Sequence, residues 1–429
     1  MEFILKNGRI LDPENNIDKI GDIFVKDGII KAIGENLTFE TAQVIDATNM
    51  WVTPGLIDIH VHLRDPGYKH KETIATGAKS AAIGGFTTIC PMANTDPITD
   101  NEVVVEYINA LAKKDAIINV IPVGAITKGL KGQELSAIGE MAKAGICAIS
   151  DDGFTVDNPA LLKVAMKYAN MFGLPIFSHC EDLRLSGNGQ INAGLHADFM
   201  GFKGISADSE EVIVSRDIIL ANSTKAKLHI MHVSTSGSIE HIRAAKAKGQ
   251  AVTAEVCPHH FTLIDEDIKE YDSNFKMNPP LRSAKDKQAL IEALQDGTID
   301  IIATDHAPHH EDDKNCEFEL ALNGIVGLET ALPLCITELV EPGILTPLQL
   351  MEKLTINPAR VINSPKGTLG IGKIADIAII DPNITYTIDK NKFLSLSKNT
   401  PFHGRKVKGK CIHLLVGGKP VVQEGQLWQ

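Results

Sequence analysis

The chain has 429 residues, too many for one small hydrophobic core, and an ordinary globular composition with 44% hydrophobic and 22% charged residues. Its 42 Lys and Arg stand against 54 Asp and Glu, and the resulting net charge of −12 argues against a nucleic-acid partner. Seven scattered cysteines without CxxC spacing, and the absence of any run of about 18 apolar residues, predict a soluble cytoplasmic protein with reduced thiols and no membrane association.

The two ends of the chain have the same character. Residues 1–52 contain short apolar runs separated by Asn7-Gly8 and Asp27-Gly28, dipeptides that are typical of tight turns between strands. Residues 366–429 repeat this pattern, with apolar runs at 375–380 and 411–416. We therefore expect these two segments to pair into one small β-sandwich domain.

Residues 53–365 alternate β-rich runs with amphipathic helical stretches, such as 101–114, 158–171, 237–248 and 284–296. Eight such alternations favour a closed (β/α)8 TIM barrel over an open doubly wound sheet. The long connection 261–283 is expected to cover the top of this barrel. The eight strand candidates are 52–62, 87–94, 118–126, 146–152, 175–181, 227–234, 252–259 and 299–309.

The first of these strands ends in the run HVHLRDPG. Side chains two apart on a strand share a face, so His60, His62 and Arg64 are expected to point the same way. Two such histidines suit a metal ion, although the HxH pattern by itself is equally compatible with a pair of buried core histidines.

The other strand ends decide between these interpretations, because reactive groups of such barrels lie at the carboxyl ends of the strands. Imidazoles and carboxylates converging on one rim predict a site for one or two divalent cations, and zinc suits them. The alternation of side chains places His229, His306 and His310 away from this rim, and we interpret His259 and His260 as structural. Parity does not choose between Asp151 and Asp152. The ionisable or amide residues at the later strand ends are Asn94, Asp151, Asp152, His179, His232, Asp305 and His309.

The motifs HLRDPG, MNPPLR and DHAPH, with PMANTDP, ISDDG, SHCED, EVCPHH and GIVGLET in the expected order, make nearly the whole chain similar to the amidohydrolase superfamily, and within it to the bacterial dihydroorotases. The resemblance implies zinc, two ions per subunit, and Asp305 as the general acid and base. The zinc ligands it implies are His60, His62, Asp152, His179 and His232. The substrate contacts it implies are His62, Arg64, Asn94, Asn278, His309, Asn323 and Gly324.

The reaction implied by the resemblance is the reversible cyclisation of N-carbamoyl-L-aspartate to L-dihydroorotate in pyrimidine biosynthesis, with metal-bound hydroxide as the nucleophile. The substrate keeps a carboxylate throughout, and Arg64 and Asn94 offer the cation and amide donors that such a group needs. The alternatives are another cyclic amidohydrolase (a hydantoinase, dihydropyrimidinase or allantoinase) and an inactive scaffold for aspartate transcarbamoylase. We also expect a homodimer, with aspartate transcarbamoylase as a candidate partner.

One departure from the wider superfamily concerns the fourth strand. Many relatives place a carboxylated lysine at its end to bridge two metals, whereas this chain has ISDDG at 149–153. Lys143 and Lys163 lie outside that strand end. An aspartate there matches the bacterial subgroup, but its shorter reach leaves the number of metals open.

Overall fold

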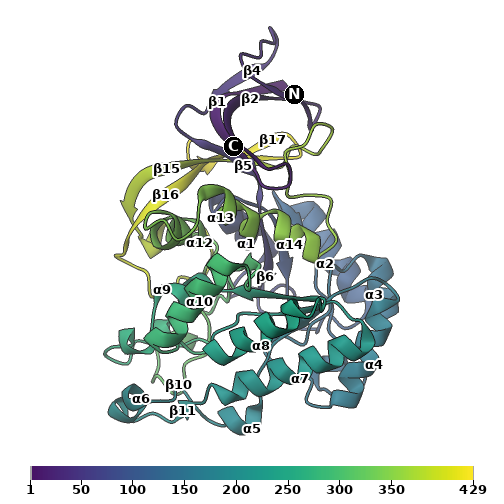
Figure 1. Cartoon of the computed structure of the whole chain (residues 1–429), viewed down its shortest axis with the longest axis vertical. Coiled ribbons are helices and arrows are strands. Elements are labelled where there is room, and N and C mark those ends of the chain that lie inside the picture. Colours follow the sequence, from purple (N-terminus) through teal and green to yellow (C-terminus); the bar gives the residue numbers. More distant parts are fainter. Residues whose placement is uncertain (1, 429) are drawn as a thin grey trace.

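The computed structural model describes residues 2–428, in which the two ends of the chain meet in one nine-stranded sheet (Figure 1). The sheet order is β18-β17-β16-β15-β5-β1-β2-β3, and β4 pairs with β1. Buried apolar side chains such as Leu5, Ile23, Ile377 and Leu415 form the core of this β-sandwich. The strands are β1 (Glu2–Asp12), β2 (Ile17–Lys26), β3 (Ile29–Gly34), β4 (Gln43–Asp46), β5 (Trp51–Pro54), β15 (Ile377–Thr387), β16 (Lys406–Val416), β17 (Lys419–Gln423) and β18 (Gln426–Leu427).

The two turn dipeptides behave differently. Asp27 and Gly28 both have positive φ angles, 51° and 78°, between β2 and β3, as a two-residue hairpin turn requires. Asn7, with a φ of 61°, and Gly8 instead lie within β1, where the pairing register with β2 shifts. The prediction of a turn at Asn7-Gly8 is therefore wrong: the dipeptide forms a bulge, and Asn tolerates its left-handed conformation.

The second part of the chain is the predicted barrel. Parallel strands β6-β7-β8 form one group and β9-β12-β13-β14 another. Bridges from Ile149 to Gly124 and Ile176 join the two groups, and a bridge between Val61 and His306 closes the circle. The fourth strand is thus reduced to the bridges at Ile149. The barrel strands are β6 (Leu56–Val61), β7 (Phe86–Pro91), β8 (Asn119–Val120), β9 (Ile176–Ser178), β12 (Leu228–Ile230), β13 (Val252–Val256) and β14 (Ile301–Ile302), and a separate pair outside it is β10 (Ile191–Asn192) with β11 (Gly204–Ile205).

The first predicted strand, 52–62, is divided between the two parts of the molecule. β5 pairs with β1 and β15 in the nine-stranded sheet, whereas β6 pairs with β7 in the barrel. Gly55 separates them, and a Cβ at this position would lie 2.1 Å from Thr87 Cγ2. A division of the chain into one domain of residues 1–52 with 366–429 and another of 53–365 remains our proposal.

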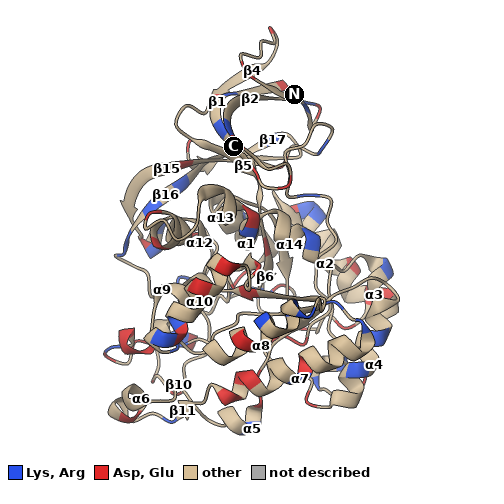
Figure 2. Cartoon of the chain, viewed as in Figure 1, with Lys and Arg blue, Asp and Glu red and all other residues tan. Residues whose placement is uncertain are grey.

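The helices surround the barrel, and acidic and basic residues are interspersed along them (Figures 1 and 2). The four predicted helices correspond to α2, α4, α8 and α10, which begin after Asn101, Asn158, Thr235 and Ser283; these side chains accept backbone N–H groups of the first turn. Among residues 2–428, no helix combines the length and apolar character needed to cross a bilayer. The helices are α1 (Ile74–Ile83), α2 (Glu102–Asp115), α3 (Ile138–Ala144), α4 (Pro159–Asn170), α5 (Leu183–Ser186), α6 (Leu195–Met200), α7 (Asp208–Thr224), α8 (Ser236–Ala247), α9 (Pro258–Thr262), α10 (Ala284–Asp296), α11 (Glu311–Lys314), α12 (Ala331–Cys335), α13 (Pro347–Leu354) and α14 (Ile356–Val361).

Candidate metal centre and active site

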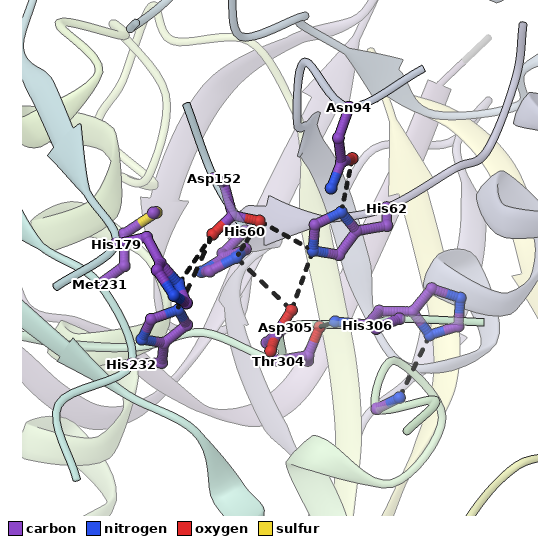
Figure 3. A network of polar contacts seen from close by, with 12 residues as sticks. His60, His62, Asn94, Asp152, His179, Met231, His232, Thr304, Asp305 and His306 are labelled. Atoms are coloured by element: carbon purple, nitrogen blue, oxygen red, sulfur yellow. Dashed lines mark hydrogen bonds and ion pairs between the residues drawn. The ribbon is translucent and has the colours of Figure 1, made fainter. Parts of the chain in front are cut away.

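Six buried side chains converge at the carboxyl ends of the barrel strands (Figure 3). Backbone geometry helps to aim two of them, because His232 and Asp305 have φ angles of 31° and 47°. Non-glycine residues in this region are uncommon and concentrate at functional sites. The six are His60 at the end of β6, His62 just beyond it, Asp152 after the Ile149 bridges, His179 after β9, His232 after β12, and Asp305 after β14.

Asp152 lies between two pairs of histidines. Its Oδ2 atom is 3.5 Å from His60 Nε2 and 3.2 Å from His62 Nε2. Its Oδ1 atom is 3.6 Å from His179 Nδ1 and 3.8 Å from His232 Nε2. Each carboxylate oxygen therefore faces a different histidine pair, an arrangement suited to a carboxylate shared by two cations.

Asp305 completes the group around His60 and His62. Its Oδ1 atom lies 3.0 Å from His62 Nε2 and 3.5 Å from His60 Nε2. His60, His62 and Asp305 offer three ligand atoms within 4.8 Å of one another, and His60, Asp152 and His232 do the same. Both groups are buried and have the spacing of first ligands around a cation.

The ring of His60 provides a test of whether these residues fit a metal. Its Nδ1 atom contacts Glu255 Oε1 at 2.5 Å, whereas its Nε2 atom is buried without a hydrogen-bond partner among the described residues. An unsatisfied buried polar atom costs about 1–3 kcal/mol. Because this nitrogen faces two carboxylates, a cation would satisfy it, and imidazole with carboxylate is a donor set that zinc accepts. The residues fit a divalent metal.

Further polar groups hold the histidine rings from outside the cluster. Glu255 bonds His60 as described, Asn94 Oδ1 lies 2.9 Å from His62 Nδ1, and Glu181 Oε2 lies 3.2 Å from His179 Nε2. Such partners orient metal-binding imidazoles and set which nitrogen carries the proton. Sequence reasoning missed Glu255 and Glu181. The signal for Glu255 was available, since it is a fully buried acidic residue in strand β13, whose other residues are Val, Thr and Ala.

The carboxylates of the cluster are held in their charged form. Burial raises the pKa of Asp152, but the charge of His60 and hydrogen bonds from His179 and His232 outweigh it and hold that pKa well below its usual range. Burial also raises the pKa of Glu255, and the His60 charge with a hydrogen bond from His229 lowers it to about 2. Both groups are therefore ionised at neutral pH, as metal ligands and their supports must be.

The residues predicted to contact substrate lie around the same rim. Arg64 Nε donates to the Pro308 carbonyl at 3.2 Å, and its Nη2 lies 3.4 Å from His309 Nε2. The same His309 nitrogen is 2.8 Å from the Asn323 carbonyl. Asn278 Nδ2 donates to Glu181 Oε2 at 2.8 Å, on the side of His179.

Gly324 must be a glycine for local reasons. Its φ is 136°, and a Cβ would lie 2.7 Å from the Ala307 Cβ. The close approach of residue 324 to the 307–309 segment therefore depends on the absence of a side chain.

Several residues that the sequence analysis set aside or left open lie away from the cluster. Asp151 accepts the backbone N–H groups of Ile126 and Thr127 at 2.8 and 2.9 Å, so it faces the segment after β8 and not the histidines. His306 contacts Glu72, and His260 contacts the Pro279 carbonyl.

His229 is buried against Glu255, at 3.0 Å, and so supports the cluster indirectly. Lys143 and Lys163 belong to helices α3 and α4.

Comparison with known proteins agrees with this geometry. The sequence profile of the family described as "Dihydro-orotase-like" matches residues 50–238. The chain is 53% identical to the dihydroorotase of Acetivibrio thermocellus over 98% of this chain and 99% of that protein. It is 48% identical to the dihydroorotase of Caldanaerobacter subterraneus over 100% and 99% of the two chains.

The solved structures that resemble it include an L-hydantoinase (dihydropyrimidinase) from Arthrobacter aurescens, with a TM-score of 0.89 and 28% identity, covering 100% of this chain and 97% of that one. They share the barrel with its β-sandwich, which agrees with the fold described above. The sequence identity and the shared architecture together show that this chain is a metal-dependent cyclic amidohydrolase, and that it belongs to the dihydroorotase family.

Proposed function

We propose that this protein is a dihydroorotase that holds two zinc ions and interconverts N-carbamoyl-L-aspartate and L-dihydroorotate in pyrimidine biosynthesis. The observation that carries the proposal is the placement of Asp152 between two histidine pairs, in a chain about half identical over its whole length to relatives named dihydroorotase. His60, His62, Asp152 and Asp305 would hold one ion. His179, His232 and the second oxygen of Asp152 would hold the other.

Asp305 is the proposed proton shuttle. A bound divalent cation would lower the pKa of water from 15.7 to about 7 and polarise the amide carbonyl. Burial raises the pKa of Asp305, but the charges of His60 and His62 and a hydrogen bond from His62 keep it below its usual value. The ionised carboxylate accepts the proton of the attacking water and passes it to the departing ring nitrogen, a role typically worth about 10² to 10⁴ in rate.

The substrate carboxylate is assigned to Arg64. Arg64 is fixed by the Pro308 carbonyl and lies beside His309, so its guanidinium is held at the rim of the metal cluster. Asn94, bonded to His62, adds an amide donor, and Asn278 and the Asn323-Gly324 backbone complete the proposed contacts. A planar guanidinium binds a carboxylate with two parallel hydrogen bonds, which favours dihydroorotate over hydantoin or dihydropyrimidine rings without that group.

The deciding experiment measures turnover of L-dihydroorotate by purified protein, with metal content counted in the same sample. Ring closure consumes one proton, so each unit by which the pH rises should shift the equilibrium about tenfold toward open N-carbamoyl-L-aspartate. Formation of dihydroorotate is therefore assayed in mild acid, and its hydrolysis in mild alkali. Hydantoin, dihydrouracil and allantoin serve as competitor substrates. Turnover of one of them with none of dihydroorotate would refute the proposal. Protein that binds no zinc when zinc is supplied, and turns over nothing, would also refute it, because that is the behaviour of a scaffold.

We further propose a cytoplasmic homodimer, with aspartate transcarbamoylase as a candidate partner. Sedimentation of the zinc-loaded protein alone gives its oligomeric state, and sedimentation with purified aspartate transcarbamoylase tests the association. A monomer would contradict the proposed homodimer, and independent sedimentation of the two proteins would contradict the proposed association.

A further inference from the structure

The segment between β15 and β16 connects the β-sandwich to the barrel rim. Residues 388–405 leave the nine-stranded sheet, and Asn399 near the end of this segment is 5% exposed. Its neighbours along the chain return to the sheet at Lys406. A side chain from outside the barrel thus enters the loops that follow strand β14.

Asn399 joins two of those loops. Its Oδ1 atom accepts the backbone N–H of His309 at 3.1 Å, and its Nδ2 atom donates to the carbonyls of Ala307 and Gly324, each at 3.0 Å. Its backbone carbonyl accepts the N–H of Val326 at 2.8 Å. One amide side chain therefore fixes the 307–309 loop against the 324–326 loop.

A second side chain holds the same glycine from another direction. Lys314 Nζ donates to the carbonyls of Lys276, Leu322 and Gly324 at 3.1, 2.8 and 3.1 Å. The Gly324 carbonyl is thus shared by Lys314 and Asn399. Lys314 ties Gly324 to the loop that carries Asn278, and Asn399 ties it to the loop that carries His309.

We propose that Asn399 is a positioning residue for substrate binding, which sets the spacing between His309 and the Asn323-Gly324 backbone. This inference rests on the proposed function, which makes both of them substrate contacts. The role needs one acceptor and two donors in a plane, and an amide supplies all three. Aspartate keeps the acceptor toward His309 but places a carboxylate against two carbonyls, and leucine has a similar shape without either capacity.

The surrounding segment keeps its place without the Asn399 side chain. Glu329 Oε1 accepts the backbone N–H groups of Leu394 and Ser395 at 2.7 and 3.0 Å, and Glu72 Oε1 accepts that of Leu396 at 3.1 Å. Substitutions at position 399 therefore change the bridge and leave the path of the chain anchored.

The test compares Asn399→Asp and Asn399→Leu with a matched control, Asn391→Asp, in zinc-loaded protein. Asn391 belongs to the same segment but is exposed, and its side chain bonds only the neighbouring Asp389 among the interactions described. We expect KM for dihydroorotate to rise roughly five- to tenfold in Asn399→Leu, with kcat within about threefold of wild type. Asn399→Asp should also raise KM, and Asn391→Asp should change neither constant.

Hydrogen exchange gives a readout that does not depend on the substrate. In Asn399→Leu the amide of His309 loses its acceptor and should exchange faster, whereas Asn399→Asp should preserve its protection. The Val326 amide, bonded to the backbone of residue 399, is the internal reference.

The inference is overturned if the wild type is active and Asn399→Leu has the same KM and the same His309 exchange rate as the wild type. Faster exchange with an unchanged KM would also overturn it, because the bridge would then be structural alone. A wild-type protein inactive on dihydroorotate would refute the proposed function instead, and exchange would still decide whether Asn399 fixes the loops.

Discussion

The two ring nitrogens of His60 have different roles: one fixes the orientation of the ring, and the other faces the proposed metal site. Its Nδ1 atom is held by Glu255, which His229 also contacts, so the ring orientation is set from within the barrel. Its Nε2 atom faces Asp152 and Asp305. A buried nitrogen without a hydrogen-bond partner calls for an explanation, and a metal ion bound at this nitrogen would supply one.

Arg64→Met should weaken substrate binding much more than it affects folding. Arg64 makes a hydrogen bond to the Pro308 carbonyl, but its proposed task is to bind the substrate carboxylate. A hydrogen bond to a charged group is worth about 1.5–3 kcal/mol, so kcat/KM should fall roughly 10- to 100-fold. Steady-state kinetics on dihydroorotate measure the effect.

The control for this change is Arg184→Met, which removes an exposed arginine that pairs with Asp157 and Asp182. Kinetics of Arg64→Met equal to those of this control would contradict the carboxylate assignment.

Asp305→Asn should abolish most turnover while the protein still folds. The amide keeps the size of the carboxylate but cannot accept the proton, and four histidines and Asp152 remain for the metal. We expect kcat to fall by two or more orders of magnitude, a barrier increase of about 2.7 kcal/mol or more.

Metal content and melting temperature are measured in the same preparations, with Asp312→Asn as the control because its side chain is 88% exposed. Near-normal kcat in Asp305→Asn would assign the proton transfer to another group, and His259 would be tested next.

The ends of the barrel strands show how much of the site can be predicted from sequence. Counting in twos along the strands is enough to put His60 and His62 on one face and His306 on another. It fails at Asp151 and Asp152, because the fourth strand is only a pair of bridges at Ile149 and the chain turns immediately afterwards. The contact of Asp151 with the 126–127 backbone, which settles the orientation, joins segments that sequence spacing does not relate.

Contacts between segments that are distant in the sequence could not be predicted from periodicity either. Glu255 was recognisable as a charged residue in an apolar strand, but its partner His60 lies 195 residues away. At the split of the first strand, a side chain on Gly55 would clash with Thr87, and at the bulge in β1 a side chain on Gly8 would clash with Val52. Periodicity predicts which elements exist, and tertiary packing decides where they bend.

Glu329, which precedes α12, is a pH-dependent anchor for the segment linking β15 to β16. Burial raises the pKa of this carboxyl group to about 7, against 4.5 for an unperturbed glutamate. Between these values the folded protein retains a proton that the unfolded chain has lost, so the contribution of Glu329 to the free energy of unfolding is present at low pH and is lost as the pH rises through 7. The whole effect amounts to at most about 3 kcal/mol.

Glu329→Gln should therefore melt at a higher temperature than wild type at pH values above about 7 and at nearly the same temperature near pH 4.5. The neutral amide can keep its carbonyl oxygen toward the Leu394 and Ser395 N–H groups. Melting is followed across this range, with the exposed Glu311→Gln as control. If the difference in melting temperature between Glu329→Gln and wild type is the same at every pH, Glu329 does not titrate in this range.

The six side chains of the cluster come from both groups of barrel strands and therefore link them across the whole barrel. The two groups are connected through the two bridges at Ile149 and the bridge between Val61 and His306. Asp152 follows the first of these junctions and Asp305 directly precedes the second. Ions held between the histidine pairs would therefore reinforce the barrel at the junctions between its two strand groups.

Removal of metal should accordingly destabilise the entire barrel and not the active site alone. A ligand that binds only the folded state stabilises it by about 2.7 kcal/mol at a free concentration a hundred times its dissociation constant. Dialysis against a chelator should thus lower the melting temperature of wild type by several degrees, and added zinc should restore it. His60→Ala, which removes one ligand and the His60 contact with Glu255, should melt lower than metal-loaded wild type and respond less to zinc. Calorimetry of wild type and His60→Ala, each with and without zinc, tests this. Identical melting of metal-loaded and metal-free wild type would show that bound metal does not reinforce the barrel.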